Sequence, residues 1–317
     1  MSRRSSLSRH RWWAALGAGV IVLGAVALAS SDRRGGSSGA PGDVRVSLSS
    51  GGRDRSYVVH TPPGFEEASG APLVLVLHGG GGDADNAMEM SGMSDKADEE
   101  DFVVAYPEGT ARRGRLRTWN AGSCCGYAQR EDVDDVAFVL DVIGAMTDDY
   151  GIDPDRVYVI GMSNGAMMAQ RIGCELDELV AGIGSVAGAL NVPCSPGGPV
   201  SVVMVHGTAD DSVPYAGGDG ADTLVDTGEH ASVADGVGFW SDNAGCSATS
   251  EDRLGDHIVR ESHTGCRDGT LVELYTVEGG GHAWPGGEKG RRQGDEPTHE
   301  LSATDVFWEA MEDRPKA

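Results

Sequence analysis

The chain has 317 residues, of which 39% are hydrophobic, and it carries 49 Asp and Glu residues against 25 Lys and Arg residues. This apolar content is enough for the core of a large α/β domain. The 48 glycines show no G-X-Y period, which excludes a collagen-like chain. The acidic balance disfavours nucleic acid and anionic membranes as partners and fits a neutral substrate.

The first 29 residues have the pattern of an export signal. Four arginines precede an uncharged apolar run over residues 12–29, which ends in the small-residue cleavage pattern Ala27-Leu28-Ala29. We therefore expect a signal peptide at 1–29, a disordered Ser/Gly/Arg-rich linker at 30–42 and one catalytic domain at 43–317. The protein would then be secreted. An uncleaved membrane anchor is the alternative, because the apolar run is long enough to cross a bilayer.

The domain opens with signals for a buried sheet. Residues 44–48 and 57–60 flank a Ser-Ser-Gly-Gly turn and predict an antiparallel hairpin. The continuous apolar run over 72–77 predicts a strand that is buried on both faces, as in a parallel sheet. It is followed by Gly79 to Gly82, whose backbone N–H groups can face a ligand. The run lacks the Gly-Lys-Ser/Thr ending of a nucleotide loop.

The next segments alternate between helix and strand patterns. Residues 85–100 predict one polar helix with a methionine face that packs on the core. A strand over 102–106 leads into a loop over 107–128, and a loop of this length is usually functional. Apolar residues at helical spacing over 134–150 predict a helix that covers the sheet.

Ser163 lies in a strand-turn-helix pattern. The apolar strand over 157–160 meets the motif Gly161-Met162-Ser163-Asn164-Gly165, and a helix-forming run follows. Such a turn holds the serine hydroxyl out at the carboxyl end of the sheet, while the Asn164 backbone N–H faces the site of a developing oxyanion. Ser163 is thus the predicted nucleophile. The alternative is an ordinary glycine-flanked serine in a βα loop.

The rest of the chain continues the α/β alternation. We expect strands over 180–186, 200–205, 257–261 and 271–275, a helix through 239–240 and a closing helix over 304–311. The fold class is therefore α/β, with a mostly parallel twisted sheet and helices on both faces.

A serine nucleophile needs a base and a carboxylate to orient that base. His282 lies in a glycine-rich loop after the last strand, where its imidazole can be presented over the serine. Asp210 and Asp211 compete for the acid. The pattern D-x-x-V-P starts at Asp210, directly after a strand and turn, and favours Asp210. The order Ser, Asp, His is that of α/β-hydrolases.

Trp119, in the long loop, and Trp284, two residues after the predicted base, are candidate substrate-binding residues. A flat indole can stack on an aromatic ring or a sugar. The alternative is that both tryptophans only pack their loops.

All six cysteines lie after the predicted signal, and an even number in an oxidising compartment indicates disulfides. We expect pairs Cys174–Cys194 and Cys246–Cys266, each closing a loop of about 20 residues. Cys124 and Cys125 would form a vicinal bridge or stay as free thiols. The cysteine spacing does not predict a metal site.

The motifs HGGGG, WNAGSCCG, VDDVAF, GMSNGAMM, HGTADDSVPY and GGGHAWPGG together resemble the secreted esterase family of polyhydroxybutyrate depolymerases, feruloyl esterases and acetylxylan esterases. This resemblance implies an α/β-hydrolase fold, no cofactor, and Ser163, His282 and Asp210 as the triad. It assigns Gly80 and Asn164 to the oxyanion hole. The substrate would be a neutral ester, either a polyester oligomer or an esterified polysaccharide, and we expect a monomer without stable membrane association after signal cleavage.

Three other activities compete with ester hydrolysis. An acyltransferase of related fold would use the same triad. A secreted peptidase is disfavoured because no gating domain is evident, and a non-catalytic binding protein is disfavoured because every member of the triad is present.

Overall fold

The computed structural model describes residues 42–67, 70–221, 229–290 and 294–316. All of them belong to one compact unit. The predicted signal peptide at 1–29 and all but the last residue of the predicted linker at 30–42 lie outside the described residues. Both therefore stay predictions.

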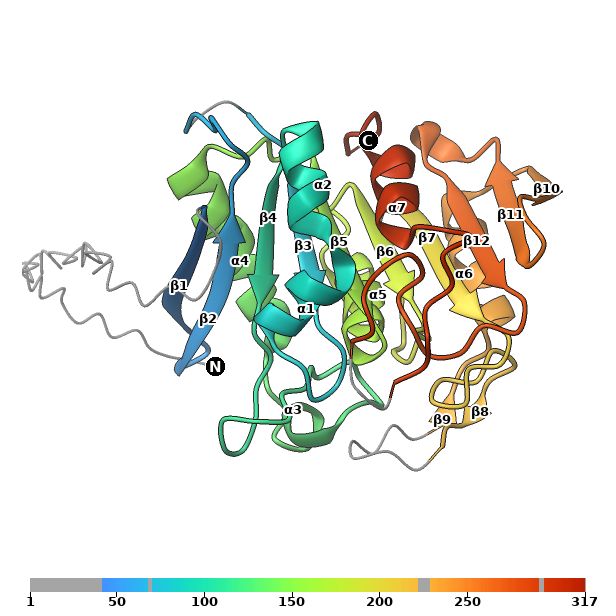
Figure 1. The fold of residues 1–317 in the computed structure, drawn as a ribbon. Coiled ribbons are helices and arrows are strands. Elements are labelled where there is room, and N and C mark those ends of the chain that lie inside the picture. Colours follow the sequence, from blue (N-terminus) through green and yellow to red (C-terminus); the bar gives the residue numbers. More distant parts are fainter. Residues whose placement is uncertain (1–41, 68–69, 222–228, 291–293, 317) are drawn as a thin grey trace, which may run out of the picture. The chain divides into compact units, whose positions relative to one another are not determined.

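A mixed ten-stranded sheet runs through the unit (Figure 1). Five neighbouring pairs in its centre are parallel, while the strands at each end pair antiparallel. This confirms the predicted mostly parallel α/β fold. In spatial order the strands are β1 (Asp43–Ser50), β2 (Arg53–His60), β4 (Val103–Pro107), β3 (Leu73–Leu77), β5 (Val157–Met162), β6 (Gly182–Val186), β7 (Ser201–Gly207), β12 (Val272–Val277), β11 (Ile258–Thr264) and β10 (Ala248–Arg253).

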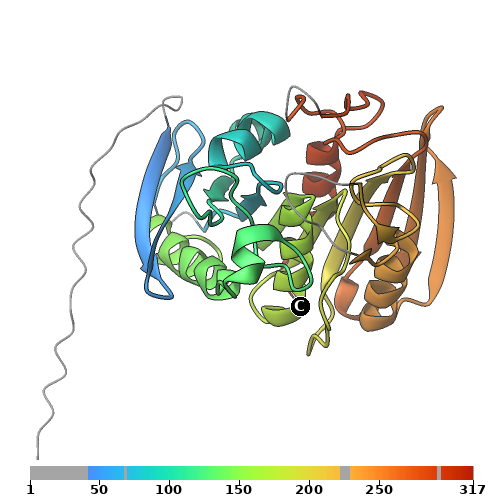
Figure 2. The ribbon, with the colours of Figure 1, turned by 90° about the horizontal axis from the view of Figure 1, so that it is seen from below.

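The apolar side chains of the central strands point to both faces of the sheet, and helices cover both faces. Every residue of these strands is therefore buried. One face packs against α4 (Asp135–Tyr150), α5 (Asn164–Glu175) and α6 (Val233–Ala244). The other packs against α1 (Ala84–Ser91), α2 (Met93–Glu100) and α7 (Ala303–Met311). The three layers are visible in Figure 2.

The structure corrects two sequence expectations. The single helix predicted over 85–100 is two helices, because Gly92 adopts a left-handed conformation with φ of 61° and separates α1 from α2. Strand β10 was not predicted, because every one of its residues is exposed and its sequence has no apolar alternation. The long loop over 107–128 also runs into a short helix, α3 (Gly126–Arg130).

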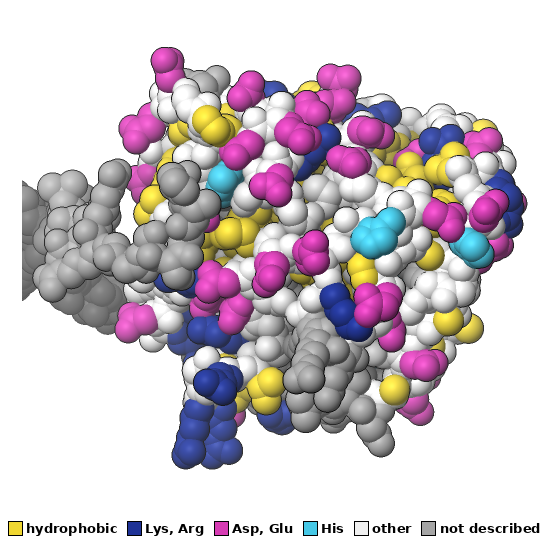
Figure 3. Space-filling view, in the orientation of Figure 1, with side chains coloured by type: hydrophobic (Ala, Val, Ile, Leu, Met, Phe, Trp, Pro, Cys, Tyr) yellow, Lys and Arg dark blue, Asp and Glu magenta, His cyan; other side chains and the backbone are white. Residues whose placement is uncertain are grey.

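The predicted disulfides Cys174–Cys194 and Cys246–Cys266 are confirmed, and Cys124 is bonded to Cys125. Figure 3 shows acidic side chains spread over one face of the molecule, in keeping with the excess of Asp and Glu. Within the described ranges, no helix is both long and apolar enough to cross a membrane.

The carboxyl ends of β3, β5, β7 and β12 meet at one edge of the sheet, since these strands are parallel. The loops after them hold the glycine run, Ser163, Asp210 and His282, respectively. The long loop that leads into α3, and the small ribbon of β8 (Gly218–Asp219) and β9 (Glu229–His230), also lie at this edge (Figure 1). The topology therefore collects the predicted functional residues on one rim.

Candidate active site

Ser163 stands in a sharp turn between β5 and α5. Its φ of 56° and ψ of −123° lie in a region that L-residues rarely adopt. A Cβ on Gly161 would lie 2.5 Å from the Gly165 carbonyl carbon, and a Cβ on Gly165 would collide with the Leu77 and His78 carbonyl oxygens. The two glycines thus allow the close approach of strand and helix that this turn needs.

The glycine loop after β3 passes beside Ser163. A Cβ built on Gly79 would lie 3.6 Å from the Ser163 Cβ, and Gly82 N–H donates to the Gly79 oxygen at 3.0 Å. Gly80 lies in this loop, and the Asn164 backbone N–H is in the first turn of α5, where helix N–H groups have no partner within the helix. Their roles as oxyanion donors stay predictions.

His78 holds the glycine loop in place. The Gly109 N–H donates to His78 Nε2 at 3.0 Å, so Nδ1 carries the proton and donates to the Gly79 oxygen at 2.8 Å. The imidazole is fully buried and fixes two loops at once. His78 therefore has a structural role beside the proposed nucleophile.

The Asn164 side chain joins the nucleophile turn to the long loop. Its Oδ1 accepts from the Trp119 N–H at 2.7 Å, and its Nδ2 donates to the Trp119 oxygen at 3.0 Å. The amide therefore pairs with both backbone groups of one residue, as a neighbouring strand would. Sequence reasoning used only the backbone of Asn164 and missed this contact.

A buried ion pair stabilises the same long loop. Arg55 Nη2 lies 2.8 Å from Asp135 Oδ1, and the other carboxylate oxygen accepts from the Asn120 N–H at 2.8 Å. The guanidinium also stacks over the Phe138 ring, with its central carbon 3.7 Å from the ring centroid. Burial raises the pKa of Asp135, while Arg55 and the Asn120 N–H oppose that rise.

At the other side of Ser163, the structure brings Asp210 and His282 together. His282 Nδ1 lies 2.7 Å from Asp210 Oδ2, while the neighbouring Asp211 is exposed. With Nδ1–H donating to the carboxylate, the imidazole Nε2 is left as the basic nitrogen. Strand β6 separates β5 from β7, so the two strands whose ends carry Ser163 and Asp210 lie about 10 Å apart.

Asp210 is held by more than His282. Its Oδ1 accepts from the N–H groups of Ser212 and Val213 at 2.8 and 2.9 Å, and Oδ2 lies 3.5 Å from His206 Nε2. Burial raises the pKa of Asp210, but the neighbouring His206 and His282 side chains and the Val213 N–H outweigh it and hold the pKa far below its usual range. The carboxylate therefore stays ionised.

Backbone hydrogen bonds hold the loop that carries His282 in place. The His282 N–H donates to Asp295 Oδ2 at 2.6 Å, and the Gly280 oxygen accepts from the Ala209 N–H at 2.9 Å. The second bond ties the His282 loop directly to the Asp210 loop. Asp295 carried no sequence signal for this role, because it lies 13 residues after His282 and only the folded loop brings the two together.

The two tryptophans have no exposed ring face in this structure. Trp119 is fully buried and its Nε1–H donates to the His78 oxygen at 3.0 Å. Trp284 is 1% exposed and donates to Thr304 Oγ1 at 3.1 Å. Stacking needs an open ring face, which neither indole has here, so the expectation of an exposed stacking surface is corrected in favour of the alternative that both rings pack their loops.

Comparison with known proteins adds to this geometry. The family described as "Esterase PHB depolymerase" matches residues 55–215, which include Ser163 and Asp210 but end before His282. NocK of Nocardia uniformis subsp. tsuyamanensis, which is named as an esterase, is 35% identical over 256 residues, covering 74% of this chain and 72% of NocK.

Feruloyl esterase B of Piromyces equi is 28% identical over 242 residues, which cover 74% of this chain but only 44% of that protein. Among solved structures, an acetyl xylan esterase from Aspergillus awamori has a TM-score of 0.57 at 13% identity, over 84% of this chain and 98% of that chain. At this identity the likeness concerns the fold, and it confirms the α/β-hydrolase architecture.

Proposed function

Because the chain belongs to the esterase PHB depolymerase family and is a carboxylic ester hydrolase, we propose that it cleaves neutral esters by a Ser163-His282-Asp210 acyl-enzyme mechanism. The hydrogen bond between His282 Nδ1 and Asp210 Oδ2, on the rim that also carries Ser163, is the observation that best supports this mechanism. The matching proteins are named as esterases and depolymerases, and acyl transfer to another acceptor gains no support from them.

The proposed reaction has two steps. Ser163 Oγ attacks the ester carbonyl while His282 Nε2 takes its proton, and the imidazolium then gives the proton to the departing alcohol. Water, activated by the same imidazole, cleaves the acyl-enzyme. The backbone N–H groups of Gly80 and Asn164 would bind the oxyanion, each contributing about 3 kcal/mol to transition-state stabilisation.

For the substrate, we propose feruloyl or acetyl esters of polysaccharides or polyhydroxyalkanoate-type polyesters. The names of the related proteins support these classes, and the acidic composition of the chain favours an uncharged substrate. Export by residues 1–29 and a monomeric state complete the proposal. The export signal rests on the basic start and apolar run of the sequence.

A hydrolysis panel tests the proposal. It contains p-nitrophenyl acyl esters, methyl ferulate, acetylated xylan and 3-hydroxybutyrate oligomers, and each is measured with the native protein and with Ser163→Ala. We expect turnover of at least one class and a loss of about 10⁶ in kcat for the variant. Equal rates for the two proteins would contradict the role of Ser163, and no hydrolysis of any ester would contradict the substrate class.

A further inference from the structure

His230 is a buried imidazole near the proposed triad that the mechanism does not use. It belongs to β9, which pairs with β8 in the segment after β7, and it is 3% exposed. The charges of Asp210, His282 and His206 all act on its protonation, so it lies within electrostatic reach of the triad. Burial, the largest influence, lowers its pKa, and the ring is therefore neutral at pH 7.

The hydrogen bonds around His230 fix which ring nitrogen carries the proton. Asn191 Oδ1 accepts from the Ala231 N–H at 3.3 Å, which orients the amide so that its Nδ2 faces His230 Nδ1 at 2.9 Å. An amide NH₂ only donates, so Nδ1 is the acceptor. In the neutral ring the proton is then on Nε2.

This Nε2–H is buried and has no hydrogen-bond partner among the residues that the structure describes. A buried donor without a partner destabilises the fold, and native proteins satisfy almost all such groups. The two loops could instead have closed over an apolar side chain at no such cost. An unsatisfied donor at a fixed position beside an active site is the arrangement expected of a group that binds an oxygen of the substrate.

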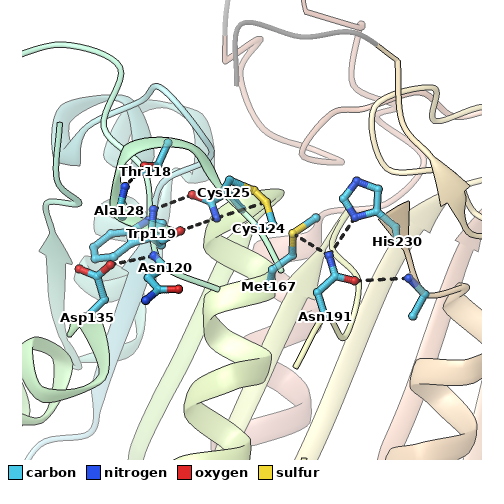
Figure 4. Close-up of a disulfide and its surroundings, with 12 residues drawn as sticks. Thr118, Trp119, Asn120, Cys124, Cys125, Ala128, Asp135, Met167, Asn191 and His230 are labelled. Carbon is cyan, nitrogen blue, oxygen red and sulfur yellow. Dashed lines mark hydrogen bonds between the residues drawn. A yellow bond between two sulfur atoms is a disulfide. The ribbon is translucent and has the colours of Figure 1, made fainter. Parts of the chain in front are cut away.

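Asn191 connects this donor to the nucleophile side of the site. Its Nδ2 contacts Met167 Sδ at 3.6 Å. The Met167 N–H in turn donates to the backbone oxygen of Ser163 at 2.9 Å. The backbone oxygen of Asn191 accepts from the Ser123 N–H at 3.2 Å, beside the Cys124–Cys125 bridge. Figure 4 shows Met167 between Cys124 and the His230 ring, whose Nε2 edge points away from Asn191.

We propose that His230 Nε2–H binds an uncharged acceptor oxygen of the ester substrate that lies outside the scissile ester group. This inference rests on the proposed function and narrows its substrate class. A neutral donor close to the ionised Asp210 favours an uncharged oxygen over an anion. In the acyl part of the substrate, two of the proposed classes supply such an oxygen: the phenol or methoxy group of a feruloyl ester and the second ester carbonyl of a hydroxyalkanoate oligomer, whereas an acetyl group has none.

Paired esters test this role. Methyl ferulate is compared with methyl cinnamate, and the methyl ester of the 3-hydroxybutyrate dimer with methyl octanoate, so that only the first ester of each pair carries oxygen atoms outside the methyl ester group. The readout is the ratio of kcat/KM within a pair, which does not depend on how much of a variant is folded. The proteins are the native chain, His230→Leu, His230→Gln, which retains an N–H donor, and a matched control.

The control is His263→Leu. His263 lies on β11 opposite Val272, at the start of β12, and is therefore at the end of the sheet away from the site. Its Nε2 is bonded to Glu261 at 2.6 Å, so the imidazole has its partners within the chain. This substitution should leave both ratios unchanged.

We expect the native protein to prefer the oxygen-bearing ester in at least one pair, and His230→Leu to reduce that preference about tenfold or more. His230→Gln should recover part of it. The pair that responds shows whether the oxygen belongs to a feruloyl ring or to a hydroxyalkanoate chain. Ratios that His230→Leu leaves unchanged would overturn this inference while the role of Ser163 stands. A native protein without preference in either pair would also overturn it, and one without any hydrolysis would contradict the proposed function as well.

Discussion

Two groups of loops flank Ser163, and they are built differently. On one side the loops after β7 and β12 bring Asp210 and His282 into direct contact, and the His282 side chain is 18% exposed. On the other side the segment around Trp119 is buried, and its backbone groups bond to fixed side chains of Asn164 and Asp135. The first group holds side chains that can exchange protons, whereas the second group provides rigidity. Substitutions should therefore lower the rate on the first side and the stability on the second.

The largest effect is expected at the carboxylate of the first side. Asp210→Asn should lower kcat by about 10⁴, because the amide no longer stabilises the imidazolium and can favour the wrong His282 tautomer. The exposed neighbour provides the control, and Asp211→Asn should retain nearly native turnover. Steady-state kinetics on one p-nitrophenyl ester measures both. If turnover were lost only with Asp211→Asn, the assignment of the acid would be wrong.

On the second side, Asp135→Ala should reduce the free energy of unfolding by about 3–5 kcal/mol, since it leaves Arg55 charged and unpaired in the core. Urea unfolding followed by circular dichroism measures it. Asp134→Ala, which removes only the N-cap of the same helix, should reduce it by about 1 kcal/mol. Equal losses for the two variants would show that the buried ion pair contributes no more to the free energy of unfolding than the N-cap does.

The Asn164 amide joins the turn that carries Ser163 to the second side. Asn164→Ala should reduce the free energy of unfolding by about 1–3 kcal/mol, because it leaves the buried Trp119 N–H without a partner, while the Trp119 oxygen still accepts from other backbone N–H groups. Asn86→Ala removes one half-buried bond to the Gly290 oxygen and should reduce it less. A loss for Asn164→Ala no larger than for Asn86→Ala would contradict a stabilising role of the Asn164 side chain.

The smallest effect concerns pH. The folded pKa of Asp210 lies below its unfolded value of about 3.9, so this carboxylate stabilises the fold above that value. The contribution is lost as the pH falls below about 4 toward the folded pKa. The urea midpoint of the native protein should therefore fall between pH 5.5 and pH 3, and it should fall less in Asp210→Asn. Parallel decreases in both proteins would exclude Asp210 as a source of acid sensitivity.

The same division separates what could and could not be predicted from the sequence. Ser163, Asp210 and His282 were predicted because each follows a strand in a short motif, and parallel strands bring their carboxyl ends to one edge. The two longer-range disulfides followed from the spacing of their cysteines. Local patterns thus gave the fold class and the proposed chemistry.

Contacts between distant segments could not be predicted in this way. The Asn164 amide meets Trp119 over a separation of 45 residues, and Arg55 meets Asp135 over 80. No periodicity records such pairs. For the same reason Trp119 and Trp284 could be expected at the substrate, since only the packed structure reveals that both indoles are buried. His230 was passed over because its role depends on Asn191, which is 39 residues away.

The central claim is that Ser163 is the nucleophile activated by His282. The most direct test is to incubate the native protein with diethyl p-nitrophenyl phosphate, which phosphorylates activated serines, and to locate the adduct by peptide mass spectrometry. Our account predicts one diethylphosphoryl group on Ser163, much slower labelling in His282→Ala and none in Ser163→Ala. An adduct on another residue, or labelling at the native rate in His282→Ala, would contradict it.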